Sequence, residues 1–395
     1  MLLTMIPYLY YCWGGRYKEH YILGQLNGDM YFSYAAVSAF VFIVMFFMTY
    51  RLAFPVFSTL VSRVSLDISY SRLIFLLSCG SVVIFAFVVL LSYRYSTGVF
   101  AFIAGLDYHS VAVKRNELSQ GGGILKLNKL FMKSWVPMHS YLFFYVICLL
   151  PSIRPMHKFF LAVSVVSGVF ASLFFLEKAV LFLYVFGFVG VYVYAGRSLK
   201  VYYIVFSFLL ALALVSIMYM LTYGDRIVDF VYLKNIILHR VMTQSVGSVM
   251  AFDYFSTFEF KGMAGVSNFW ASLNNEVFSS PYADIIKYYV PETADISGAL
   301  SSFVTGEAYG LFGLYGVFAS GMIIAFWYAF FEATKYSKAL SVIFVGVYGL
   351  YFSHPYVASS FFGFVWPLGL LYNILPFVLL LIFSLNFKVY FSKIA

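Results

Sequence analysis

The sequence predicts an all-α, polytopic membrane protein of about ten transmembrane helices with one large exterior loop. Two observations predict this class. The 395 residues are 63% hydrophobic and only 10% charged, whereas a soluble domain carries about 25% charged residues. A water-soluble core of this size would leave too few polar residues to cover it. Apolar runs long enough to cross a bilayer also recur along the chain, so we interpret residues 1–395 as one transmembrane domain.

A membrane-spanning helix needs about 20 mostly apolar residues. The clear candidates are 31–50, 73–93, 135–151, 159–176, 179–195, 201–223, 306–331 and 367–386. Segment 339–353 is shorter but equally apolar, and we include it. Residues 2–13 are too short for a complete span and are counted as a weak first one.

Lysine and arginine in short loops predict the orientation, because cytoplasmic loops carry an excess of both. Basic residues occur in loops 51–72, 152–158, 196–200 and 332–338 and in the C-terminal tail. If all these segments are cytoplasmic, successive spans cross the membrane in alternate directions. Segments 224–305 and 354–366 then lie outside.

Loop 94–134 is basic although the alternation places it outside. Longer loops cross the membrane whatever their charge, which is one explanation. The other is a patch that recruits an anionic lipid headgroup, with Lys114 and Arg115 as its candidates. In that case the amphipathic stretch Ile124–Trp135 is expected to form a helix at the membrane interface.

Segment 224–305 is too long for a connection without a purpose. Its first part, Asp225–Gln244, has helical periodicity and carries Arg226 and Arg240 on similar sides, about 21 Å apart along a straight helix. The remainder is polar and rich in turn residues. We interpret the segment as a small folded subdomain, the alternative being a solvated loop.

Several ionisable residues from different spans map to the same outer face. They are Lys178, Arg226, Arg240, Glu307 and His354. Each has an ordinary explanation alone: Lys178 neighbours Glu177, and Glu307 opens a helix whose dipole favours an acid. Together they predict one cavity at that face. Cys12, Cys79 and Cys148 show neither a disulfide framework nor metal-ligand spacing.

Three short stretches resemble a known family. They are Phe175–Ala179 (FLEKA), Ile236–Val241 (IILHRV) and Gly306–Gly313 (GEAYGLFG). With the many spans and the large late loop, they resemble the O-antigen or oligosaccharide repeat-unit polymerases, called Wzy. The resemblance implies a fold like the C-type glycosyltransferases. It also implies polymerisation of undecaprenyl-diphosphate-linked repeat units at the periplasmic face of the bacterial inner membrane, with transfer of the growing glycan to the incoming unit.

The resemblance also implies roles for individual residues. Arg240, Glu307 and His354 are the candidate catalytic residues, and Arg226, Arg240 and Lys178 the candidate diphosphate ligands. Cationic side chains suit a diphosphate leaving group. Neither a metal nor another cofactor is expected. The expected partners are the lipid-linked glycans, membrane lipid and a chain-length regulator protein, and nucleic acid is not among them.

Two rival functions are weighed. An O-antigen ligase usually has Arg where Lys178 stands and a His late in the large loop, whereas this chain has no His between 240 and 353. A lipid-linked oligosaccharide flippase should have two related halves, short loops and a polar path through the bundle. Spans 31–50, 73–93, 201–223 and 367–386 contain no Asp, Glu, Lys, Arg or His, which favours a polymerase.

Overall fold

The computed structural model describes residues 26, 30–64, 66–97, 100, 124–174, 178–223, 246–289, 291, 304–353 and 368–385. Within these ranges the regular structure is helical, apart from one isolated bridge between Ile68 and Leu385. The chain divides into two compact units. Unit 1 comprises Met1–Pro55, Val228–Ala329 and Pro355–Gly369, and unit 2 comprises Val56–Ile227, Phe330–His354 and Leu370–Ala395. The predicted all-helical class is confirmed for the described residues.

Four helices of the described chain are long and apolar enough to cross a membrane. They are α2 (Met30–Ser62), α3 (Tyr70–Arg94), α8 (Pro155–Leu173) and α15 (Val304–Ala333). Five further helices are α7 (Val136–Leu149), α9 (Lys178–Tyr194), α10 (Val201–Tyr223), α16 (Lys338–Ser353) and α19 (Leu368–Ser384). Apart from the C-terminal end of α2, these helices begin and end within a few residues of the predicted spans. The protein is thus a helical membrane protein, while the total of about ten spans stays a prediction, and residues 2–13 lie outside the described residues.

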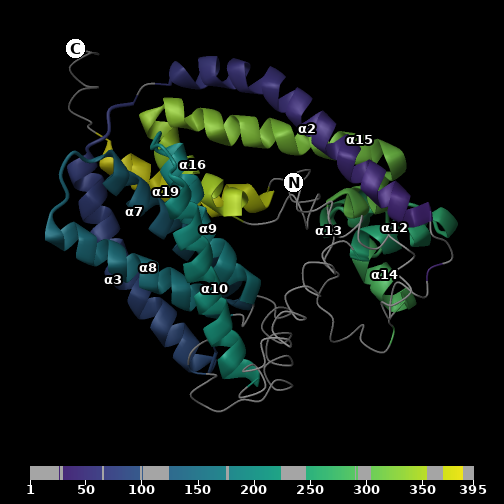
Figure 1. The fold of residues 1–395 in the computed structure, drawn as a ribbon, viewed down its shortest axis with the longest axis horizontal. Helices are drawn as coiled ribbons and strands as arrows, with labels where there is room; N and C mark the ends of the chain where they lie inside the picture. Colours follow the sequence, from purple (N-terminus) through teal and green to yellow (C-terminus); the bar gives the residue numbers. More distant parts are fainter. Residues whose placement is uncertain are drawn as a thin grey trace. The chain divides into compact units, whose positions relative to one another are not determined.

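Unit 2 is a bundle built around α7, α8, α9 and α16. In it α3 packs on α8, α8 on α7, α10 on α9, and α16 on both α7 and α9 (Figure 1). Glycines allow the closest approaches: a Cβ on Gly346 would lie 2.8 Å from the Met138 Cβ, and one on Gly349 would lie 2.7 Å from the Tyr141 ring. Small residues at helix contacts are typical of membrane bundles, where close packing replaces the hydrophobic drive.

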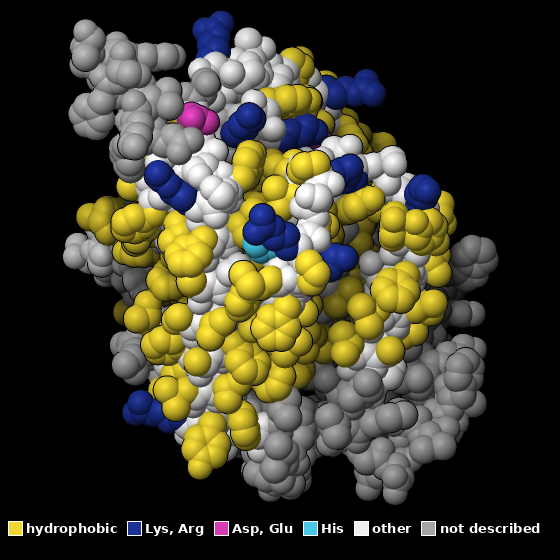
Figure 2. All heavy atoms as spheres, turned by 90° about the vertical axis from the view of Figure 1, so that its left-hand side faces the viewer, with side chains coloured by type: hydrophobic (Ala, Val, Ile, Leu, Met, Phe, Trp, Pro, Cys, Tyr) yellow, Lys and Arg dark blue, Asp and Glu magenta, His cyan; other side chains and the backbone are white. Residues whose placement is uncertain are grey.

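The outer surface of these helices is apolar, as a lipid-facing surface requires. On α3 alone, Phe75 is 66% exposed and Leu90 is 59% exposed. Figure 2 shows a broad apolar surface with lysine and arginine side chains gathered toward one end of it. A soluble protein rarely exposes so large an apolar area.

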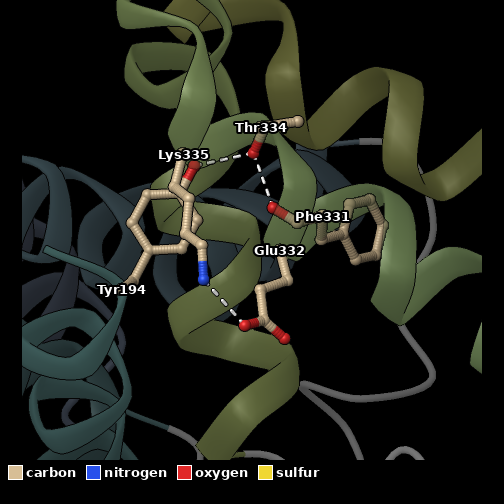
Figure 3. Close-up of polar contacts among 5 residues, drawn as sticks. All are labelled: Tyr194, Phe331, Glu332, Thr334 and Lys335. Atoms are coloured by element: carbon tan, nitrogen blue, oxygen red, sulfur yellow. Dashed lines mark hydrogen bonds and ion pairs between the residues drawn. The ribbon is translucent and has the colours of Figure 1, made fainter. Parts of the chain in front are cut away.

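The connections predicted to be basic and cytoplasmic meet at one end of unit 2. Hydrogen bonds join them: Ser69 N to Ser384 O (2.9 Å), Arg72 Nη1 to Leu385 O (3.0 Å), Ser337 Oγ to Val64 O (2.7 Å), and Arg197 to Cys148 O. Tyr194 and Thr334 share a further hydroxyl–hydroxyl bond of 2.7 Å (Figure 3). This is the arrangement that the alternation of basic loops predicts.

Two boundaries differ from the predictions. Helix α2 continues to Ser62 over 33 residues, so Arg51 lies within a helix and not in a loop. At roughly 50 Å, α2 is longer than the hydrocarbon core of about 30 Å. The extension is stabilised by aromatic packing against α15, for example Phe57 on Phe330 at 5.5 Å between ring centroids.

The second difference concerns Ile124–Trp135. This stretch is helical, as α6 (Ile124–Leu130) and the π-helical η3 (Phe131–Trp135), but it runs directly into α7. Met132 is buried against Val88 and Val136. The predicted helix is therefore present and joined to the bundle by this buried contact, while its location at the membrane interface stays a prediction.

Unit 1 contains the described part of the predicted large loop. Residues 246–289 fold into α12 (Val246–Thr257), η5 (Gly262–Gly265), α13 (Asn268–Leu273) and α14 (Pro281–Tyr289). In unit 1 the first parts of α2 and α15 pack together, and a Cβ on Gly321 would lie 2.7 Å from the Phe42 carbonyl oxygen. These elements position the candidate site.

Candidate functional site

The candidate site is built where α12 packs on the beginning of α15. A Cβ on Gly306 would lie 2.6 Å from the Ser248 Cα, and one on Gly310 would lie 2.6 Å from the Phe255 ring. Their spacing of four places both glycines on one face of α15. The resemblance stretch Gly306–Gly313 thus begins with a helix contact that requires glycine.

Asp253 lies inside this packing, in the middle of the otherwise apolar helix α12. It is 2% exposed. The Tyr289 hydroxyl of α14 donates a hydrogen bond to its Oδ2, while Oδ1 accepts none from the described residues. A buried acceptor without a partner costs about 1–3 kcal/mol. Such an oxygen is unusual in a native interior.

Helix α14 positions Tyr289. The helix is amphipathic, and Ile285, Ile286 and Tyr289 form its buried face. Its first turn is capped by Ser280, whose Oγ accepts from the Ala283 N–H at 3.3 Å. Burial raises the pKa of Tyr289, and the hydrogen bond to Asp253 raises it further. The phenol therefore remains a neutral donor that fixes one oxygen of the carboxylate.

An ion pair holds α14 to the preceding turn. Lys261 pairs with Asp284, which also accepts from the Ser279 hydroxyl. The Lys261 N–H donates to Gly310 O at 3.0 Å, which ties the same turn to α15. The framework around Asp253 is thereby connected from α12 through α14 to α15.

Hydroxyl and aromatic groups also make contacts at the residues next to Asp253. The Tyr31 hydroxyl of α2 lies 3.1 Å from Ser256 Oγ, which donates to the backbone oxygen of Asp253 at 2.6 Å. The ring of Phe252, the residue before Asp253, stacks on the Tyr309 ring with centroids 4.2 Å apart. The site is thus a buried carboxylate held by one phenol, that of Tyr289, on a helix that also contacts α2 and α15.

Glu307 is a second buried acid of the same helix pair. It is 2% exposed and follows Gly306, the residue that contacts α12. Thr305, two residues before Glu307, accepts a hydrogen bond from Ser38 Oγ of α2 at 3.2 Å. The start of α15 is therefore packed between α2 and α12, with both acids on this packed pair.

The structure does not describe the side chains of the other predicted site residues. Arg226, Arg240, His354, Lys114 and Arg115 lie outside the described residues. Lys178 is the first residue of α9, and its side chain is outside them too. Of the predicted site residues, Glu307 is the one whose surroundings the structure describes.

A second buried polar group lies within unit 2. His139 of α7 is 5% exposed, and its Nδ1 lies 2.9 Å from Ser164 Oγ of α8. Ser140 Oγ donates to Ser164 O at 2.8 Å, so the two helices are joined by polar contacts inside the bundle. The sequence analysis did not single out His139, although it is an ionisable residue inside the predicted span 135–151.

Among the described residues, no group of three or more His, Cys, Asp or Glu side chains could hold a metal ion. Comparisons with protein-family models, with curated proteins and with solved structures each find no match to this chain. The functional argument therefore depends on the fold, the site and the resemblance of the short stretches.

Sequence reasoning missed Asp253 and Tyr289. The signal for Asp253 is present: it is the one residue among Asp, Glu, Lys, Arg and His in the run Val246–Thr257. An acid within an apolar helix needs a partner or a function. Tyr289 could not be found in this way, because it is one of 35 tyrosines.

Proposed function

We propose that this chain is a membrane glycosyltransferase that polymerises undecaprenyl-diphosphate-linked oligosaccharide repeat units. The reaction takes place at the periplasmic face of the bacterial inner membrane, in the synthesis of O-antigen or capsule-type polysaccharide. The observation that carries the proposal is the buried Asp253, with one oxygen fixed by Tyr289 and the other accepting no hydrogen bond from the described residues. The Gly306–Gly313 stretch, which resembles the polymerases, forms the helix packed against α12.

The proposed chemistry needs a proton acceptor, and Asp253 supplies one. The hydroxyl of the incoming repeat unit loses its proton to Asp253 as its oxygen attacks the anomeric carbon of the growing glycan. The bond between that carbon and the diphosphate oxygen breaks, and its electron pair leaves with the lipid diphosphate. The anomeric configuration is inverted because the attack comes from the opposite face.

The remaining roles follow the resemblance. Arg240 and Lys178 bind the diphosphate and stabilise the charge that develops on it. Arg226 binds the same diphosphate only if the helix between Arg226 and Arg240 breaks, because a straight helix would separate the two by about 21 Å. Glu307 and His354 are catalytic residues of the proposal together with Arg240 and Asp253. In this proposal Lys114 and Arg115 recruit lipid headgroups to the site, and a chain-length regulator is a partner.

One observation favours a second function, that of a lipid-linked oligosaccharide flippase. A flippase moves a polar headgroup through the bundle, and His139, Ser140 and Ser164 form a polar contact inside unit 2. All three side chains are buried, so the contact also serves as an ordinary link between α7 and α8. The exterior subdomain has no role in a flippase, and we therefore rank this function second.

Deletion of the protein in its own host separates the two functions. We expect a polymerase deletion to leave single repeat units available outside, so that surface glycan carries one unit in place of a ladder. The measurement is gel electrophoresis of surface glycan combined with location of the lipid-linked units. Accumulation of those units only at the cytoplasmic face would exclude the polymerase and support the flippase.

A further inference from the structure

Two neighbouring connections of unit 2 carry exposed cations. One lies between α7 and α8, the other between α9 and α10. Their exposed basic residues are Arg154, Lys158, Arg197 and Lys200. Segments 148–160 and 195–205 contain no Asp or Glu. The local charge of these connections is therefore positive throughout.

Contacts hold the two connections together. The Arg197 guanidinium donates to the carbonyl oxygen of Cys148 at the end of α7. The Tyr145 and Tyr194 rings, on α7 and α9, lie 5.5 Å apart between centroids. Tyr194 is fixed in turn by Thr334, beside the Glu332–Lys335 ion pair at 2.8 Å (Figure 3). The four cations thus belong to one packed end of the bundle.

Tyrosines lie beside these cations. The Tyr203 ring lies 5.4 Å from Tyr192 and 4.1 Å from Tyr202 between centroids. Lys200 Nζ lies 5.9 Å from the centroid of Tyr202. Tyrosine prefers the headgroup level of a bilayer because its ring is apolar and its hydroxyl polar.

Apolar side chains are exposed next to the same residues. Met156 and Phe159 on α8 are each 63% exposed, and Val201 on α10 is 74% exposed. In a membrane, acyl chains cover these apolar groups, whereas a neutral lipid would leave the cations without a counter-charge. A lipid with an anionic headgroup satisfies both.

We propose that Arg154, Lys158, Arg197 and Lys200 form a binding site for anionic phospholipid. The cations bind the phosphate of the headgroup, and the acyl chains lie against the exposed apolar side chains of α8 and α10. Arginine contributes two parallel N–H donors to a phosphate, and lysine a mobile point charge. Basic sites between membrane helices bind anionic headgroups in this way. The site is separate from the Asp253 centre, and its test does not depend on glycan transfer.

The test measures lipid binding to the purified full-length chain in neutral detergent, by the shift in unfolding temperature on titration with phosphatidylglycerol. The variant is Lys158→Gln with Lys200→Gln, one cation from each connection. Arg197 is left in place because it also donates to Cys148. We expect the apparent Kd to rise about 30-fold for the double variant and about fivefold for each single variant.

The matched control for each single variant removes one exposed cation elsewhere, Lys287 on α14. Lys287→Gln should bind phosphatidylglycerol as the unaltered protein does. Three results would overturn the proposal. They are an unchanged Kd in the single variants, equal binding of phosphatidylcholine, and equal stabilisation by inorganic pyrophosphate, which would show that no lipid is required.

Discussion

At the scale of single residues, Asp253 and Tyr289 define the chemistry of unit 1. The two are 36 positions apart, and their hydrogen bond forms because α14 packs on α12. Burial and the adjacent carboxylate raise the pKa of Tyr289, so the phenol stays protonated and acts as a hydrogen-bond donor. The carboxylate is thereby oriented with one oxygen remaining for a further partner.

Asp253→Asn tests this role, because the amide keeps the shape and still accepts from Tyr289 but cannot take up a proton. We expect glycan polymerisation to fall by about 10²–10⁴-fold, as loss of a general base predicts. The measurement is the length distribution of surface glycan, normalised to the amount of inserted protein. Glu259→Gln is the control, since Glu259 is an exposed acid just beyond the end of α12. A normal ladder from stably expressed Asp253→Asn protein would disprove the assignment.

At the scale of elements, α15 is a broken helix. Phe312 and Gly313 have non-helical angles within Val304–Ala333, and Gly313 has φ 62° and ψ −146°. This backbone region is essentially restricted to glycine. The break separates a short first piece, which carries Glu307, from the long apolar span. In membrane proteins, interrupted helices are tolerated where protein or a cavity satisfies the freed backbone groups.

Gly313→Ala should therefore destabilise the protein by about 1–3 kcal/mol. The new Cβ would also lie 3.1 Å from the Phe260 ring. Thermal unfolding of the purified chain measures the change. The matched control is Gly196→Ala, because Gly196 also has a positive φ, 73°, but a Cβ there meets nothing within 4 Å. Equal losses in the two variants would show that the contact with Phe260 and the particular ψ add nothing.

At the scale of the whole molecule, the basic segments of unit 2 are also the segments that contacts bring together. The segments that join its helices at one end are basic, and hydrogen bonds such as Arg72 to Leu385 and Ser337 to Val64 bring them together. A protein whose basic connections share one end is expected to place that end in the cytoplasm. The subdomain carrying α12 and α14 is then expected outside.

Reporter fusions test this orientation. A fusion at Asn274, in the subdomain, should report the exterior side, and one at the C-terminal Ala395 the cytoplasmic side. A pair of reporters active on opposite sides of the membrane distinguishes the two locations. Activity of both fusions on the same side would overturn the topology and, with it, the exterior location of the Asp253 centre.

The class of protein and the approximate bounds of most described helices can be predicted from the sequence alone. Segment 201–223 is predicted and observed as the same helix, and 73–93 lies within α3. Such segments are recognised because span length and apolar composition are local properties. The ends of α2 and of Ile124–Trp135 were predicted less well, since packing against other helices decides where each of them ends or continues.

The pairing of polar groups cannot be predicted from the sequence and is seen in the folded protein alone. Glu307 was found from the sequence because its position at a helix start is a local feature. The partner of Asp253, the contact between His139 and Ser164, and the joining of Arg197 to Cys148 all link residues far apart in the chain. Hydropathy and charge alternation give the side of the membrane to which a residue belongs, but they carry no information about which helices are neighbours. Close packing at glycines such as Gly306 and Gly349 selects the neighbouring helices, and these contacts form only when the chain folds.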